Sequence, residues 1–74
     1  MKLKFQIHFQ QRIVERSIDV DHIKWAINNP DQTAQSFDDR VVVIKKIDFR
    51  KIKVVYIRPK EKDNTYVIIT AYYL

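Results

Sequence analysis

The chain has 74 residues, with 14 lysines and arginines, 9 aspartates and glutamates, and neither cysteine nor glycine. This length predicts one domain (1–74), near the lower limit at which a single hydrophobic core is stable, and the lack of cysteine excludes disulfides and thiolate metal sites. No apolar run approaches the roughly 20 residues of a membrane span, and the basic N-terminus lacks the apolar stretch of a signal peptide. We therefore expect no membrane association and a cytoplasmic location.

The net charge of +5 is spread along the chain rather than gathered in a tail. This distribution favours a folded basic surface over a disordered basic arm. Nucleic acid is the commonest partner of such a surface, and an acidic protein is the next candidate. Because a core of this size is small, a homodimer is a further candidate assembly.

The first two elements are expected to be a strand and a helix. Apolar and polar residues alternate over Lys2–Phe9, which predicts a half-buried strand that ends near Ile7. His8 would then lie at the junction with a helix that ends near residues 16–17. The residues expected on the core side of this helix are Phe9, Ile13 and Val14.

A second helix is expected to start at Asp19 and to form a short αα-hairpin with the first. Asp19 can cap the helix, and Ile18 can pack against Ile23 across the cap as a hydrophobic staple. The Asn29-Pro30 pair ends the helix, because asparagine tolerates a left-handed cap and the residue before proline resists helical geometry.

The pattern then changes to that of an antiparallel sheet of about four strands, predicted at Gln32–Phe37, Arg40–Ile47, Lys51–Arg58 and Thr65–Tyr73. The apolar run at 41–44 suggests a strand buried on both faces. Turns are expected at 38–39 and 48–49, and a charged loop at 59–64. Without glycine, these turns rely on Asp and Asn to reach positive φ. The predicted fold class is α+β, with both helices packed on one face of the sheet.

One polar stripe stands out on the first helix. His8, Arg12 and Arg16 are four residues apart, so they lie on one helical face. The stripe combines a side chain that exchanges protons near neutral pH with two forked cationic donors, which suits an anionic partner such as phosphate. The alternative is a solvated helix face on which Glu15, Asp19 or water neutralises the arginines.

Sequence motifs for metal or cofactor chemistry are missing. The chain has no glycine-rich phosphate loop, no H-E-x-x-H motif and no serine-centred triad signature. The two histidines, His8 and His22, lie on different predicted helices without ligand spacing, and His22 is expected to be an ordinary surface residue. We expect neither a metal nor a cofactor.

A metal-independent ribonuclease needs fewer groups, because the RNA 2′-hydroxyl is its own nucleophile. The protein must help to move two protons and must stabilise the charge that develops on phosphorus. Thr70 and Tyr72 alternate to one face of the last strand, and Lys51 and Lys53 share a face of the strand before it. The alternative is that Thr70 and Tyr72 are ordinary strand residues and that Lys51 and Lys53 only form the solvent-exposed side of an amphipathic strand.

The complete pattern resembles a known family. The residues that carry the resemblance are the His8/Arg12/Arg16 spacing, Ile18, Asn29-Pro30 and the segment 67–72, Val-Ile-Ile-Thr-Ala-Tyr. They resemble a family of small uncharacterised bacterial and archaeal domains with the pattern H-A-x-x-R-(three residues)-R-x-I, then N-P, then V-x-T-x-Y. That family is similar to the barnase–EndoU–colicin–RelE superfamily of metal-independent ribonucleases, which includes toxins of toxin–antitoxin pairs.

The resemblance implies a RelE-like topology and a site on the first helix and the last strand. His8 would be the acid/base, Arg12 and Arg16 would bind phosphate, and Thr70 and Tyr72 would line the same site. Three features depart from the family pattern: Phe9 replaces the usual alanine, the turn glycines are absent, and the central strands have no unambiguous counterpart of the family's basic residue. The residues that would contact nucleic acid outside this site are Lys45, Lys46, Lys51 and Lys53, where either Lys45 or Lys46 matches the family's basic position.

The function predicted from the sequence is therefore a cofactor-free RNA endonuclease of toxin type, neutralised by an acidic antitoxin protein. The alternative is a non-catalytic module on the same fold that binds nucleic acid or protein. Fold analogy alone does not decide between them, so the sequence leaves open whether the chain is an enzyme.

Overall fold

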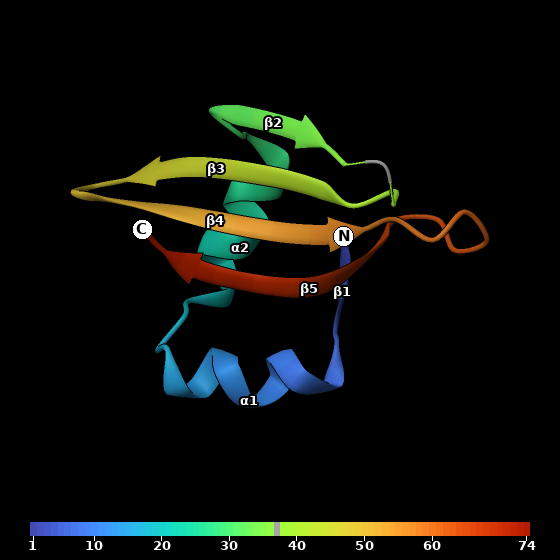
Figure 1. Ribbon diagram of the computed structural model, residues 1–74, viewed down its shortest axis with the longest axis horizontal. Coiled ribbons are helices and arrows are strands. Elements are labelled where there is room, and N and C mark those ends of the chain that lie inside the picture. Colours follow the sequence, from blue (N-terminus) through green and yellow to red (C-terminus); the bar gives the residue numbers. More distant parts are fainter. Residues whose placement is uncertain (37) are drawn as a thin grey trace.

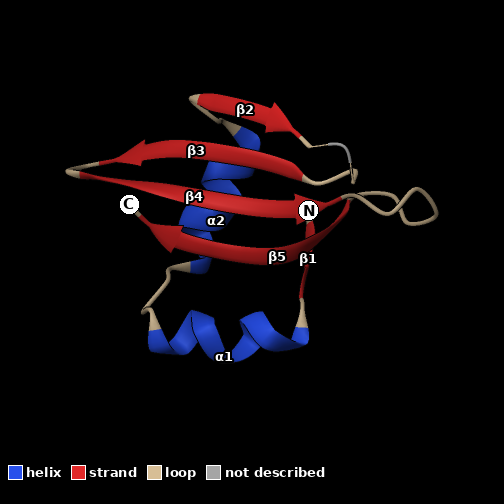
Figure 2. Cartoon of the chain, in the orientation of Figure 1, coloured by secondary structure: helices blue, strands red, loops and turns tan. Residues whose placement is uncertain are grey.

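The computed structural model describes residues 1–36 and 38–74. Figure 1 shows the elements, which in chain order are β1 (Lys2–Phe5), α1 (Ile7–Glu15), α2 (Val20–Asn28), β2 (Gln32–Gln35), β3 (Val41–Ile47), β4 (Arg50–Ile57) and β5 (Thr65–Tyr73). The predicted α+β class and the order of strand, two helices and sheet are confirmed (Figure 2). The strand predicted at Gln32–Phe37 ends at Gln35, and Phe37 lies outside the described residues.

The strands form one five-stranded sheet in the order β1-β5-β4-β3-β2. Strands β2 to β5 pair antiparallel as predicted. The N-terminal strand joins the same sheet, because β1 pairs parallel to β5. This pairing is short, since residues 2–5 pair only with residues 65–68 and leave the second half of β5 with a free edge.

The hydrophobic core lies between the helices and one face of the sheet. In Figure 1, α2 crosses behind β3 and β4, and α1 lies alongside β5. The buried apolar residues from the helical segment are Phe9, Ile18, Ile23, Ala26 and Ile27, and those from the sheet are Val43, Ile47, Ile52, Val54, Tyr56, Ile68 and Ala71. The prediction that Val14 faces the core is wrong, because its side chain is 77 % exposed. Helical geometry explains this, since Phe9 and Ile13 define the inner face and Val14 is turned about 100° from Ile13.

No helix of the described chain packs on the opposite side of the sheet, which we call the open face. The prediction that β3 is buried on both faces is therefore wrong. Val43 is buried on the helix side, whereas Val42 and Ile44, which point to the open face, are only partly buried. β4 follows its predicted alternation, with Ile52, Val54 and Tyr56 on the core side.

Helix α2 begins and ends where the sequence predicts. The Asp19 carboxylate accepts a hydrogen bond from the Asp21 backbone N–H at 2.9 Å and caps the helix. Ile18 and Ile23, on either side of this cap, are both buried, as expected for a hydrophobic staple. Asn29 ends the helix at φ −138°, so the predicted left-handed cap is wrong and the restriction before Pro30 accounts for the stop.

Among residues 1–36 and 38–74, four residues adopt positive φ angles. Asp39, Asp48 and Asn64 have φ between 56° and 63° in the turns that precede β3, β4 and β5, as predicted for a chain without glycine. Ser17, between the two helices, has φ 51° and was not predicted. No helix in the described part of the chain is long and apolar enough to cross a membrane.

We expect Ile23→Ala to lower the free energy of unfolding by about 2–5 kcal/mol, because it removes a fully buried side chain from the helix–sheet interface. Val14→Ala, on the exposed side of α1, is the matched control and should change stability by less than about 0.5 kcal/mol. Denaturant unfolding followed by circular dichroism measures both. Equal losses in the two variants would contradict the assignment of the buried face.

Asp31 links the end of α2 to β3. One carboxylate oxygen accepts a hydrogen bond from the Lys46 backbone N–H at 2.7 Å, and the other lies 3.3 Å from the Lys45 ammonium. The backbone hydrogen bond from Lys46 first, and the hydrogen bond and charge of Lys45 second, lower the pKa of Asp31 below its usual value.

A lowered pKa means that the folded state favours the charged carboxylate, so this contribution to stability is present at neutral pH and is lost as the pH falls through the folded pKa. Asp31→Asn should therefore melt at a lower temperature than the parent protein at pH 7. The difference should begin to shrink below about pH 4, where the carboxyl of the unfolded chain takes up a proton, and should vanish below the lowered pKa of the folded state. Thermal unfolding at several pH values tests this, and a difference that does not vary with pH would refute it.

Candidate functional site

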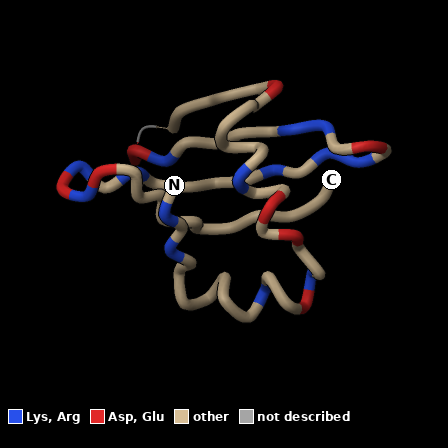
Figure 3. The backbone as a smooth tube through the Cα atoms, turned by 180° about the vertical axis from the view of Figure 1, so that it is seen from behind, with Lys and Arg blue, Asp and Glu red and all other residues tan. Residues whose placement is uncertain are grey.

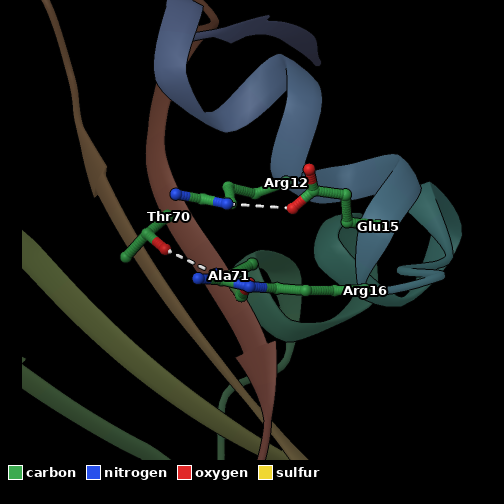
Figure 4. A network of polar contacts seen from close by, with 5 residues as sticks. All are labelled: Arg12, Glu15, Arg16, Thr70 and Ala71. Carbon is green, nitrogen blue, oxygen red and sulfur yellow. Dashed lines mark hydrogen bonds and ion pairs between the residues drawn. The ribbon is translucent and has the colours of Figure 1, made fainter.

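The candidate site forms where β5 loses its strand partner. The Gln6 backbone N–H donates to the Ile68 carbonyl at 3.0 Å, and the chain then leaves the sheet and enters α1. Helix α1 consequently runs beside the unpaired half of β5 (Figure 1). Arg16, the residue that caps the C-terminus of α1, extends to this edge (Figure 4).

Arg16 is fixed on β5 by two hydrogen bonds. Its Nη1 donates to the Ala71 carbonyl oxygen at 3.1 Å and to Thr70 Oγ1 at 3.2 Å. The carbonyl would otherwise be an unpaired group on a strand edge, so the guanidinium replaces a missing strand at this point. Arg16 and Thr70, which the family resemblance assigns to one site, are therefore in direct contact.

Tyr72 brings a second cation into the same cluster. The guanidinium carbon of Arg16 lies 5.8 Å from the centre of the Tyr72 ring, and the Lys53 ammonium lies 5.9 Å from the same centre. Both distances are near the limit of about 6 Å for a cation–π contact. Tyr72 is opposite Lys53 in the register of β4 and β5, so both side chains point to the open face. Arg16, Lys53, Thr70 and Tyr72 form what we call the Arg16 cluster.

Arg12 lies next to this cluster but is paired on its own helix. Its Nη1 is 2.9 Å from the Glu15 carboxylate, and both side chains are about half exposed. An exposed pair of this kind contributes at most about 1 kcal/mol and is easily exchanged for another anion. Figure 4 shows the Arg12 and Arg16 guanidinium groups on the same side of α1, directed towards β5.

His8 is the second residue of α1 and is exposed. It shares the helical face of Arg12 and Arg16 by spacing, but its imidazole forms no hydrogen bond with the described residues. The structure therefore brings together Arg16, Thr70 and Tyr72 from the predicted catalytic set. Arg12 and His8 lie further along the same helix without direct contact to the cluster.

The predicted nucleic-acid-binding lysines lie on two different faces. Lys46 and Lys51 are opposite each other in the β3–β4 register and share the open face with Lys53. Lys45 is on the helix side, where its ammonium lies 3.3 Å from Asp31 and 5.2 Å from the centre of the Trp25 ring. Lys45 is thus separated by the sheet from the other three lysines.

A second polar cluster lies on the helix side of the same end of β5. The Tyr73 hydroxyl lies 2.8 Å from His22 Nδ1 and accepts a hydrogen bond from the Asp19 backbone N–H at 3.2 Å. The Arg50 guanidinium stacks on the Tyr73 ring at 3.9 Å. His22, Arg50 and Tyr73 border a cavity of about 200 Å³, which Ile47, Asp48 and Phe49 also line.

The prediction that His22 is an ordinary surface residue is wrong, because it is partly buried against Tyr73. The two residues are 51 positions apart. A periodic pattern in one sequence reports which residues share a helical or strand face, and it carries no signal for a contact at this separation. Only the pairing of α2 with the sheet reveals it.

Among the described residues, no three histidine, aspartate or glutamate side chains are placed to hold a metal ion. The carboxylates instead serve local structure. Asp19 caps α2, Asp31 binds the β3 backbone, and Glu15 pairs with Arg12. Asp38, whose pKa is lowered first by the Ser36 hydroxyl that donates to it and then by the nearby Arg40, closes the turn before β3.

Comparison with known proteins identifies the family. Residues 5–73 match DUF4258, which is described as a domain of unknown function. The chain belongs to DUF4258. The predicted membership of an uncharacterised family is confirmed at this level, and the match includes every residue of the candidate site. No curated protein and no solved structure matches the chain.

The two neighbouring tyrosines at the end of β5 allow a matched test of this DUF4258 structure. Tyr73→Phe leaves the Asp19 N–H and His22 Nδ1 without their partner, and we expect it to lower the free energy of unfolding by about 1–3 kcal/mol. Tyr72→Phe should leave stability nearly unchanged, because the Tyr72 hydroxyl forms no hydrogen bond with the described residues. Equal effects of the two substitutions in chemical denaturation would contradict the assigned contacts.

Proposed function

We propose that this protein is a metal-independent RNA endonuclease whose site spans α1 and the end of β5. The observation that carries the proposal is the Arg16 cluster, where an arginine is fixed on a strand edge beside a threonine hydroxyl, a tyrosine and a second cation. A fixed guanidinium with nearby hydroxyls and cations suits a phosphodiester, which carries one negative charge and several acceptor oxygens.

Arg16 keeps donors for a ligand. Only its Nη1 hydrogen-bonds to the described residues, through Thr70 and Ala71, so Nε and Nη2 can donate to two phosphate oxygens. Lys53 supplies a second positive charge on the open face, and Arg12 can exchange Glu15 for phosphate. These cations would stabilise the charge that develops on phosphorus during cleavage.

The reaction we propose is transesterification within the RNA. The 2′-oxygen attacks the adjacent phosphorus as its proton passes to a base, and the bond from phosphorus to the 5′-oxygen of the next nucleotide breaks as that oxygen takes a proton. The products are a 2′,3′-cyclic phosphate and a free 5′-hydroxyl. His8 is the residue we assign to one of these proton transfers, because it is exposed on the same helical face as both arginines.

The resemblance to the barnase–EndoU–colicin–RelE superfamily supports the same assignment, because its members cleave RNA without a metal. By the same resemblance, we propose a toxin that acts on cytoplasmic RNA and is neutralised by an acidic antitoxin protein. The net charge of +5 is consistent with both an RNA substrate and an acidic partner.

RNA cleavage by the purified protein in the presence of EDTA tests the proposal. We expect a 2′,3′-cyclic phosphate at the cut and no cut where the 2′-hydroxyl is replaced by hydrogen. His8→Ala should lower the rate by about 10²–10⁴-fold, and Arg16→Ala by about 10²–10³-fold. Gln11→Ala and Lys24→Ala, at exposed helix positions outside the site, are the neutral and the charged control.

Circular dichroism of each variant separates loss of activity from loss of fold. Absence of cleavage by the folded parent protein, with naked RNA and with ribosome-bound message, would refute the enzyme. Retention of cleavage in folded His8→Ala would refute the assigned role of His8.

One observation favours a second function, a non-catalytic module that binds RNA. No described residue hydrogen-bonds to His8, so nothing in the chain orients its imidazole for proton transfer. The module predicts that the parent protein and His8→Ala retard RNA equally in a gel and that neither cleaves it. Arg16→Ala should weaken retardation in either case.

A further inference from the structure

The open face exposes an apolar surface that no part of the described chain covers. The aliphatic side chains on this face come from three neighbouring strands, and all are only partly buried: Val42, Ile44, Val55, Ile57 and Val67. In Figure 1, no element crosses in front of β3 and β4, whereas α2 covers them from behind. A sheet with apolar residues on both faces normally has a layer of structure against each face.

Positive charge surrounds this surface, and negative charge is absent from it. None of the five strands contains an aspartate or glutamate; every acidic residue lies in a helix, turn or loop (Figure 3). Four lysines share the open face with these aliphatic residues: Lys4, Lys46, Lys51 and Lys53. Lys4 is opposite Val67, and Lys53 is opposite Ile44.

The crowding of these charges is visible at one corner of the face. The Lys62 side chain, in the loop before β5, is the main cause that lowers the pKa of Lys4, because a second ammonium nearby disfavours the charged form. A negatively charged group bound at this corner would relieve that repulsion.

We propose that the open face is a docking surface for an acidic amphipathic helix of a partner protein, with apolar side chains against the aliphatic residues and carboxylates against the lysines. A helix suits the shape, because β4, with eight residues, extends about 26 Å, and about 17 helical residues span the same length. A second copy of the chain would place lysines against lysines across the interface, so charge disfavours it.

The same docking would regulate the candidate site. Tyr72 and Lys53 belong to both the open face and the Arg16 cluster, so a helix on this face covers one side of the cluster. A bound helix would therefore inhibit RNA cleavage, and this effect rests on the proposed function. The docking itself does not.

The probe is an 18-residue helical peptide with leucine on one face and glutamate on the other. One control peptide has the same composition in an order without an apolar face, and another has lysine in place of glutamate. We expect the leucine–glutamate peptide alone to bind, and to shift the backbone NMR signals of the open-face aliphatic residues rather than those of α1 and α2.

The test variant of the protein is Ile44→Thr/Val55→Thr, which keeps β-branched residues in the strands while making the face polar. It should weaken peptide binding by at least about tenfold, and Val14→Thr on exposed α1 is the matched control. Equal binding of the control peptides, or no effect of the double substitution in a variant that folds, would overturn the proposal. So would a dimer in sedimentation that Ile44→Thr/Val55→Thr converts to monomer, because a second copy would then occupy the face.

RNA cleavage in the same samples keeps the two proposals distinct. Inhibition of cleavage by the leucine–glutamate peptide supports both docking and its regulatory effect. Peptide binding at the open face without any RNA cleavage by the parent protein refutes the proposed enzyme and leaves the docking surface supported. Cleavage that the peptide does not affect, with no peptide bound, refutes the docking surface alone.

Discussion

β1 pairs with only four residues of β5, and this short parallel pairing determines where the polar groups of the protein gather. The chain leaves the sheet at Gln6, so α1 has to run along the part of β5 that has no strand partner. An open strand edge requires hydrogen-bond partners, and Arg16 supplies one to the Ala71 carbonyl. A longer β1 would occupy this edge itself and would leave no place for the guanidinium.

The hydrophobic core lies on one face of the sheet only, and this leaves the other face uncovered. Helix α2 packs behind β3 and β4 and helix α1 lies alongside β5, so the apolar residues of the open face remain without a second layer in the described chain. The acidic residues contribute to this asymmetry because they cap helices and close turns, where short carboxylates accept backbone hydrogen bonds. The strands are left with lysine, arginine and uncharged residues, and the positive charge of the chain therefore concentrates on the sheet.

Sequence patterns predicted the elements that depend on local chemistry. Asp19 caps α2 as its position indicates, the alternation of β4 places Ile52 and Val54 in the core, and Asp48 turns the β3–β4 hairpin. The same patterns could not predict that β1 joins the sheet in parallel. That pairing depends on which edge the returning β5 leaves free, and residues 2–5 alone contain no information about it.

The side of the sheet to which each lysine points was ambiguous for a related reason. Residues 41–44 are all apolar, so the sequence does not show which residues of β3 point to the core. Lys45 and Lys46 were therefore equally good candidates for the family's basic position. The structure decides the question, because Val43 and Ile47 are buried. Lys45 lies between them at alternate positions and therefore points to the helix side. The family resemblance assigned Arg16 and Thr70 to one site without predicting their hydrogen bond, whereas the contact of His22 with Tyr73 had no sequence signal.

The end of β5 contacts the C-terminal end of α1 and the start of α2. Tyr72 and Tyr73 are consecutive and point to opposite faces, where Tyr72 contacts Arg16 and Tyr73 binds the start of α2. The segment between the helices, with Ser17 at positive φ, is therefore held from two sides of one strand. A guanidinium held in this way loses little further freedom when an anion binds, which favours binding through preorganisation. Because Tyr72 also lies on the open face, a ligand that moves its ring acts on the Arg16 side chain directly.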